Sequence, residues 1–186
     1  MSKLIYSFLA SLDGYIADGA GNFDWAVPDE EVLDFINDVE RGVSTYLYGR
    51  TMYELMVGWE TDPAFAAQSP RSAEFAEIWK AADKVVFSRG LESVSTSRTR
   101  LVREFDPVLV RQLKDEAAGD LNISGAEVAS SAWRAGVIDE CQIFVAPVIV
   151  GSGKRMFPDN LRRPLELIDE RRFDNGMVFL RYAVRH

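Results

Sequence analysis

The sequence has little of what most hydrolytic and metal-dependent sites need. Its 186 residues include one cysteine, Cys141, and one histidine, His186, which is the last residue. A single cysteine excludes an intrachain disulfide, and these two residues cannot supply a zinc site of the usual type. A terminal histidine makes a Ser-His-Asp triad a poor interpretation, and no G-x-S-x-G nucleophile elbow occurs.

Long apolar runs and a basic leader are also absent. The longest apolar stretch, Ile143 to Val150, is interrupted by Pro147 and is shorter than the roughly 18 residues of a membrane span. The N-terminus begins a strand-like pattern within four residues and lacks the pattern of a signal peptide. We therefore expect a cytoplasmic protein that has no membrane partner.

Positive charge is scarce, because 21 lysines and arginines face 29 acidic residues and the net charge is −8. Such a chain repels nucleic acid on average, so we expect no nucleic-acid partner. A phosphorylated ligand needs only a local group of cations. Basic residues are locally dense over Arg98 to Arg111 and Lys154 to Arg163, although solvated surface charge explains most of them equally well.

The composition is that of one globular domain spanning residues 1–186, with 47% apolar and 27% charged residues. Strands and helices alternate and then give way to strands alone, which predicts an α/β fold with a mainly parallel sheet, helices on both faces and an antiparallel hairpin around Asn175-Gly176. Gly58 to Ser72 is expected to be a long loop. The expected strands are 3–12, 45–48, 84–88, 100–105, 121–123, 140–150, 165–172 and 177–184, and the expected helices begin at 28, 51, 72, 107 and 127.

Ligands of such sheets bind where strands end and helices begin. Gly49-Arg50-Thr51 and Ser124-Gly125-Ala126 are junctions of this kind, and Ser88-Arg89-Gly90 follows another strand. Each fits a phosphate anchor, and each is also explained as a plain turn. A Rossmann G-x-G-x-x-G is absent, and Gly151-Ser152-Gly153-Lys154 fails the Walker pattern at both ends.

Carboxylates are the remaining candidates for proton transfer. Asp13 ends the first strand, and Glu30 follows Asp29 in the first turn of a helix. Any of the three could hold or protonate a substrate, whereas the structural alternatives are a turn former for Asp13 and helix-dipole acids for Asp29 and Glu30. Trp25 with Phe23 could line a pocket for a ring, although such aromatics more often belong to the core.

Five stretches together resemble the dihydrofolate-reductase-like family, and most closely its branch with the riboflavin-biosynthesis reductase (RibD C-terminal) domain and its stand-alone bacterial relatives. The resemblance covers nearly the whole chain in the family's order. The stretches are SLDGYIAD (11–18), YLYGRTMYE (46–54), VVFSRGL (85–91), ISGAEVASSAW (123–133) and GVIDECQIFVAPVIVGSGKRMF (136–157).

The resemblance implies a three-layer fold with about eight strands and NADPH lying across the sheet. It places Gly49, Arg50 and Thr51 at the cofactor phosphates, and Ser88 and Arg89 at the 2′-phosphate, which favours NADPH over NADH. The pyrophosphate corner has Ser124 where the family usually has glycine. Also implied are contacts of the pyrophosphate with Gly125, Ala126, Glu127 and Val128, of the nicotinamide with Ala10, Ile16 and Ala17, and of the substrate with Asp13, Trp25 and Gly151.

The resemblance also implies an activity, which is hydride transfer from NADPH to a pteridine, an aminouracil or a similar heterocycle. Asp13, Glu30 or an ordered water would deliver the proton. The alternatives are an NADPH-binding or sensing protein without catalysis and a structural domain without a nucleotide. We further expect a homodimer that uses the strand Ile143 to Val150 and the late hairpin, and we expect no metal.

Overall fold

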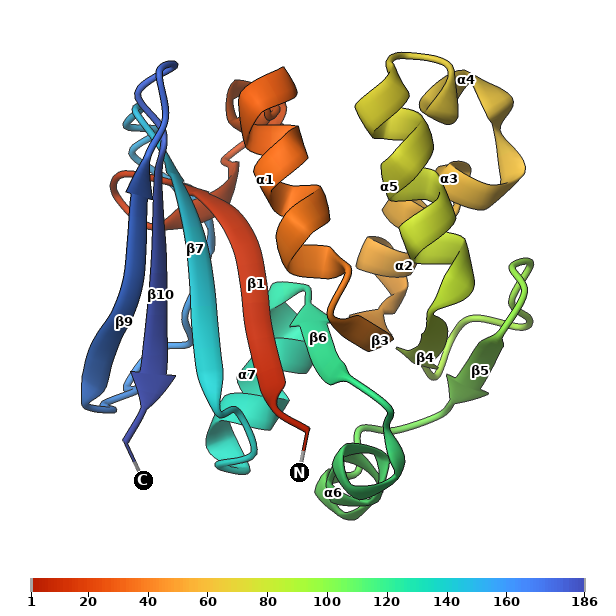
Figure 1. Cartoon of the computed structure of the whole chain (residues 1–186). Helices are drawn as coiled ribbons and strands as arrows, with labels where there is room; N and C mark the ends of the chain where they lie inside the picture. The colour runs from red at the N-terminus through yellow and green to blue at the C-terminus, as the bar shows by residue number, and fades with distance from the viewer. Residues whose placement is uncertain (1, 186) are drawn as a thin grey trace.

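The computed structural model describes residues 2–185, so His186 lies outside the described part (Figure 1). Its main sheet has eight strands in the order β5-β4-β3-β6-β1-β7-β10-β9. The first six are parallel, and β10 is antiparallel to both β7 and β9. The strands are β1 (Leu4–Ser11), β3 (Val43–Gly49), β4 (Asp83–Phe87), β5 (Thr99–Val102), β6 (Asp120–Ser124), β7 (Glu140–Ala146), β9 (Leu165–Arg172) and β10 (Val178–Val184).

Helices cover both faces of this sheet. One face packs against α1, α2 and α5, and the other packs against α6 and α7. This arrangement confirms the predicted α/β fold of the dihydrofolate-reductase type, with its mainly parallel sheet and final hairpin. The helices are η1 (Asp24–Ala26), α1 (Glu30–Glu40), α2 (Arg50–Met56), α3 (Gly58–Thr61), α4 (Pro63–Ala66), α5 (Pro70–Ala81), α6 (Pro107–Glu116) and α7 (Ala126–Arg134).

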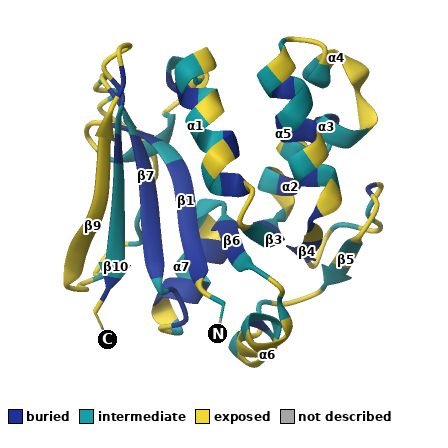
Figure 2. Ribbon diagram, viewed as in Figure 1, coloured by how far each residue is buried: buried dark blue, intermediate teal, exposed yellow. Residues whose placement is uncertain are grey.

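The central strands β1 and β7 are almost wholly buried (Figure 2) because neighbouring strands flank them and helices cover both faces. Tyr6 and Trp133 belong to the core beneath α6 and α7. On the opposite face, Trp79 of α5 donates a hydrogen bond from Nε1 to the hydroxyl of Tyr48, 3.0 Å away. This bond satisfies two polar groups that would be costly to bury alone.

Local sequence signals fix the helix ends. Asp29 caps α1 by accepting a hydrogen bond from the backbone N–H of Val32, and Asp106 caps α6 ahead of Pro107 in the same way. Gly136 follows α7 with φ +64°, the left-handed conformation that commonly ends a helix.

The prediction of a loop over Gly58 to Ser72 is wrong. The segment contains α3, α4 and the start of α5, because Asp62 caps α4 with Pro63 at its first position. The ring of Trp59 lies 5.2 Å from that of Phe65 and 4.7 Å from that of Phe75, so these short helices are held by aromatic packing. The prolines open helices here instead of breaking them.

The strand predicted over 140–150 is also too long, since β7 ends at Ala146. Pro147 follows and has no N–H to donate to a sheet. The chain then returns as β8 (Gly153–Arg155), which pairs with β2 (Tyr15–Asp18) in a small second sheet that the sequence did not predict. Gly153 has φ +137°, and a Cβ there would lie 2.0 Å from the carbonyl oxygen of Ala17.

The expected dimer surface needs a correction as well. β7 lies between β1 and β10, and its side chains are mostly buried, so Ile143 to Ala146 offer no edge for pairing. β9 is the outer strand and is exposed along its whole length (Figure 2), with Leu165, Leu167 and Ile168 facing solvent. Within residues 2–185 no helix is long and apolar enough to cross a membrane.

Candidate functional site

The predicted phosphate anchors meet at one edge of the sheet. β1, β3, β4, β6 and β7 are parallel, so the residues that follow them share the carboxyl edge. Tyr48 pairs with Ser124, and Gly49 pairs with Phe87. The register therefore brings three junctions that are far apart in sequence to adjacent positions.

A cleft of about 580 Å³ opens at this edge, and we call it the β3–β6 cleft. Nine residues predicted at the cofactor phosphates line it: Gly49, Arg50, Thr51, Ser88, Arg89, Gly125, Ala126, Glu127 and Val128. The other lining residues are Met52, Phe87, Arg103, Glu104, Phe105, Ser131 and Lys154.

The corner of the cleft requires glycine. Gly125 caps the start of α7 with φ +104°, a conformation that L-residues rarely adopt. A Cβ there would lie 3.4 Å from Cβ of Met52 and 4.0 Å from the backbone nitrogen of Gly49. The first N–H groups of α7 have no partner within the helix, so this open corner can receive an anion.

Cations surround the corner in exposed ion pairs. Arg50 Nε lies 2.7 Å from Glu54, Arg89 lies 2.8 Å from Glu104, and Lys154 lies 3.6 Å from Glu127. Such surface pairs contribute only about 0–1 kcal/mol each. A phosphate could therefore replace these carboxylates at small cost.

Arg103 and Lys154 also line the cleft, although neither was predicted as a cofactor contact. Arg103 donates from Nη1 to the carbonyl oxygens of Arg89 and Leu91, which ties β5 to the turn after β4. Arg103 and Lys154 each lie in one of the two stretches where basic residues are dense. That local density was the sequence feature that could have indicated them as site residues.

The turn after β4 is fixed by Ser88. Its Oγ accepts a hydrogen bond of 3.0 Å from the backbone N–H of Leu91, so it shapes the loop that presents Arg89. Beside it the rings of Phe87 and Phe105 lie 5.3 Å apart and give the cleft an apolar wall. Charge and an aromatic surface together suit a nucleotide.

Ser124 is absent from the described lining of this cleft. Its hydroxyl lies 3.0 Å from both the carbonyl oxygen of Ser7 and Oδ1 of Asn122, to which it donates. The side chain is therefore hydrogen-bonded toward β1 and within β6, and its contact with the cofactor stays a prediction.

The residues expected near the nicotinamide lie apart from the β3–β6 cleft. Ala10 is fully buried in β1, whereas Ile16 and Ala17 belong to β2 and are half-buried. Ile16 packs against the core beneath α7. None of the three lines the cleft as described.

Asp13 and Gly151 are brought together. The carboxylate of Asp13 accepts hydrogen bonds from the backbone N–H groups of Gly151 (2.8 Å) and Val150 (3.2 Å), which joins the loops after β1 and β7. The Ser11 hydroxyl, together with these N–H groups, holds the pKa of Asp13 below its ordinary value. Such a carboxylate is a poor proton donor near neutral pH.

Glu30 and Trp25 make contacts with other parts of the protein, and neither lines the β3–β6 cleft. Glu30 is exposed at the start of α1 and forms an ion pair of 2.9 Å with Arg71 of α5. Trp25 donates from Nε1 to the carbonyl oxygen of Asn22, 3.2 Å away, and packs against the core that includes Val32 and Phe144. The core interpretation of Trp25 is therefore the one that its contacts support.

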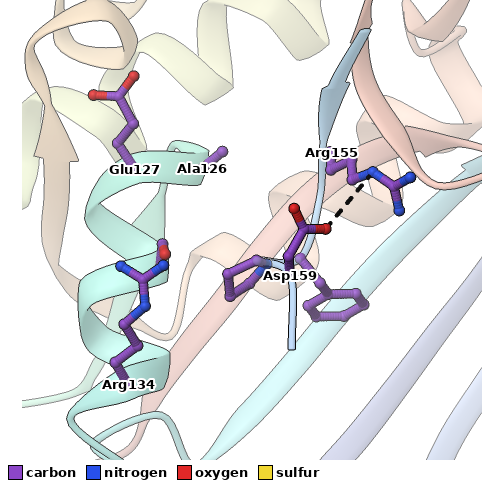
Figure 3. Close-up of a pocket in the computed structure, with 8 residues that line it drawn as sticks. Ala126, Glu127, Arg134, Arg155 and Asp159 are labelled. Atoms are coloured by element: carbon purple, nitrogen blue, oxygen red, sulfur yellow. Dashed lines mark ion pairs between the residues drawn. The ribbon is translucent and has the colours of Figure 1, made fainter. Parts of the chain in front are cut away.

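A second, smaller hollow of about 450 Å³ also borders the α7 N-terminus (Figure 3). It is lined by Ala126, Glu127 and Arg134 of α7 and by Arg155 and Asp159, whose Nε and Oδ1 lie 4.0 Å apart. Its charges are balanced.

In the part of the chain that the structure describes, no group of histidine, cysteine and acidic residues could hold a metal ion.

Comparison with known proteins identifies the family of this chain. The chain belongs to the RibD C-terminal domain family, whose pattern matches residues 2–179. It is similar to the uncharacterized protein YyaP of Bacillus subtilis (strain 168), with 28% identity over 97% of this chain and 94% of the relative.

Two solved structures share the fold. A putative riboflavin biosynthesis protein from Shewanella sp. PV-4 superposes with a TM-score of 0.76 and 21% identity over 99% of both chains. A diaminohydroxyphosphoribosylaminopyrimidine deaminase/5-amino-6-(5-phosphoribosylamino)uracil reductase from Thermotoga maritima gives a TM-score of 0.67 and 15% identity, over 99% of this chain and 57% of that one.

Proposed function

We propose that this protein is an NADPH-dependent reductase. The observation that carries the proposal is the β3–β6 cleft, in which a glycine corner at the start of α7 lies among Arg50, Arg89 and Lys154. Membership of the RibD C-terminal domain family supports a reductase role of the type found in riboflavin biosynthesis.

The residues of the cleft fit such a cofactor. Gly125 and the first N–H groups of α7 would hold the pyrophosphate, because its oxygens would accept hydrogen bonds from N–H groups that have no partner within the helix. Ser88, Arg89 and Arg103 would hold the 2′-phosphate, since arginine presents a fork of donors that matches phosphate oxygens. When bound, NADPH supplies the hydride.

The substrate that we propose is a planar heterocycle with a reducible C=N or C=O bond, such as a pteridine or an aminouracil. Reduction consumes one hydride from the cofactor and one proton. Asp13 is held ionised and anchors Gly151, so we assign it to positioning. Glu30, released from Arg71, or an ordered water would deliver the proton.

Two measurements test this proposal. NADPH should raise the melting temperature more than NADH does, because only NADPH carries the 2′-phosphate. NADPH oxidation should then be followed with a panel of pterins, aminouracils and quinones. Binding without turnover on any of them would favour a non-catalytic NADPH-binding or sensing protein. The contacts of Asp13 with Gly151 and of Glu30 with Arg71 favour this alternative, because they occupy both candidate proton donors.

The proposal includes a cytoplasmic homodimer that pairs along β9. Leu165, Leu167 and Ile168 are 39–46% exposed on this edge strand, and exposed apolar side chains on an unpaired edge favour association. Light scattering should then report about twice the chain's 20.9 kDa. A mass equal to that of one chain would reject the dimer.

A further inference from the structure

A row of polar side chains, buried at Glu40 and Asn122 and half-buried at Ser124, runs from the end of α1 toward the cleft. Glu40 is the last residue of α1, Asn122 lies in the middle of β6, and Ser124 ends that strand. Asn122 donates from Nδ2 to Oε1 of Glu40 (2.9 Å), and Ser124 donates to Oδ1 of Asn122 (3.0 Å). We call these three residues the polar row.

Glu40 sets the direction of these hydrogen bonds. Oε1 of Glu40 acts as an acceptor, so the amide nitrogen of Asn122 must face it. The carbonyl oxygen Oδ1 of Asn122 consequently faces Ser124, whose hydroxyl becomes the donor. The orientation of Ser124 thus depends on a residue in another element.

The polar row ends at the corner of the cleft. Ser124 directly precedes Gly125, which caps α7, and pairs with Tyr48, which directly precedes Gly49. The hydroxyl of Ser124 is also shared with the carbonyl oxygen of Ser7 in β1. A change in the row is therefore transmitted to the backbone that forms the corner.

The surroundings of Glu40 lack a compensating cation. The titratable groups that face it are Tyr46 and Tyr48 of β3, and Glu40 forms no ion pair with any residue in 2–185. Oε2 of Glu40 and the hydroxyl of Tyr46 are both buried, and hydrogen bonds from Tyr46 and Asn122 favour the ionised form of Glu40, but burial outweighs them. Burial raises the pKa of Glu40 to about 7.

We propose that Glu40 is a positioning residue for the Ser124–Gly125 corner and acts on it through Asn122. The carboxyl group of Glu40 accepts from Asn122 in either protonation state and so holds the row in the orientation described. Ionisation adds an uncompensated negative charge at the far end of the row, and its repulsion of the cofactor phosphates makes the cofactor bind less tightly as pH rises. Only this last consequence rests on the proposed function.

The direct test needs no cofactor. In ¹⁵N-labelled protein, the backbone amides of Ser124 and Gly125 should titrate with a midpoint near pH 7. Glu40→Gln should abolish this titration while keeping the shifts seen at low pH, because glutamine offers the same acceptor. Asn122→Leu should also abolish it at Gly125, since the link is broken. Glu77→Gln, an exposed glutamate of α5, is the control and should leave the titration unchanged.

A second readout uses NADPH affinity. The wild-type Kd should rise about fivefold between pH 6 and pH 8.5, whereas Glu40→Gln should stay constant, and Glu40→Leu should be at least fivefold weaker throughout. The proposal is overturned if the Gly125 amide titrates equally in wild type and Glu40→Gln, or does not titrate at all. An absence of NADPH binding with the titration intact would reject the proposed function and keep the role of Glu40 at the corner.

Discussion

Gly125 lies close to Gly49 where two strand-to-helix junctions meet, since a Cβ on Gly125 would lie 4.0 Å from the backbone nitrogen of Gly49. The two residues are far apart in sequence and come from neighbouring parallel strands. Their contact leaves the start of α7 open to a ligand, and the proposed function depends on this geometry.

Gly125→Ala should weaken NADPH binding at least tenfold. Alanine is strained at φ +104°, and relief of that strain would turn the N–H groups of the corner away from the pyrophosphate. Calorimetry measures the change. Gly136→Ala is the matched control, because Gly136 also has positive φ but has open space around it and lies outside the cleft. Equal losses in both variants would contradict a specific role for the corner.

Arg89→Ala should weaken NADPH about tenfold and leave NADH almost unchanged, since only NADPH has a 2′-phosphate for the guanidinium to hold. The Kd values of both cofactors test this. Arg98→Ala, in which a different exposed arginine loses its ion pair with Asp83, should change neither value. A parallel loss of NADH affinity in Arg89→Ala would show that Arg89 does not select the phosphate.

The pH dependence of the free energy of unfolding should depend on Glu40. Its pKa is about 7 in the folded protein and 4.5 ordinarily, so the stabilising contribution is complete below pH 4.5 and is lost as pH rises toward 7. The free energy of unfolding of the wild type minus that of Glu40→Gln should fall by about 3 kcal/mol across that window. Urea unfolding at several pH values measures it, and a flat difference would show that Glu40 is not a buried acid.

Asp13→Asn should leave the shape of the pH–rate profile unchanged. Hydrogen bonds from Ser11, Gly151 and Val150 keep the pKa of Asp13 low, so it carries no proton to donate at neutral pH. Turnover should fall because an amide accepts only one of the two backbone donors well. Loss of one limb of the profile in Asp13→Asn would instead identify Asp13 as the acid. The same profile measured for Glu30→Gln tests the other candidate acid.

Much of the fold was predictable, because periodic apolar residues marked the buried strands and Asn175-Gly176 marked the final hairpin. The hairpin strand 165–172 was predicted to the residue. The short helices α3 and α4 were missed, because prolines and small residues over 58–72 resemble a loop until Trp59 packs on Phe65 and Phe75.

The site was predictable only in part. The junctions at Gly49 and Gly125 have local sequence signals, and their meeting follows from parallel strands. Arg103 joins them only because β5 lies beside β4. The polar row is beyond sequence reasoning, since Glu40 and Asn122 are 82 positions apart and meet only through packing.

Calorimetric titration of the wild-type protein with NADPH tests the central claim most directly. We predict saturable binding at one site per chain, with tighter binding of NADPH than of NADH and loss of that binding in Gly125→Ala. Absence of binding, or binding that is unchanged in Gly125→Ala, would contradict the assignment of the β3–β6 cleft.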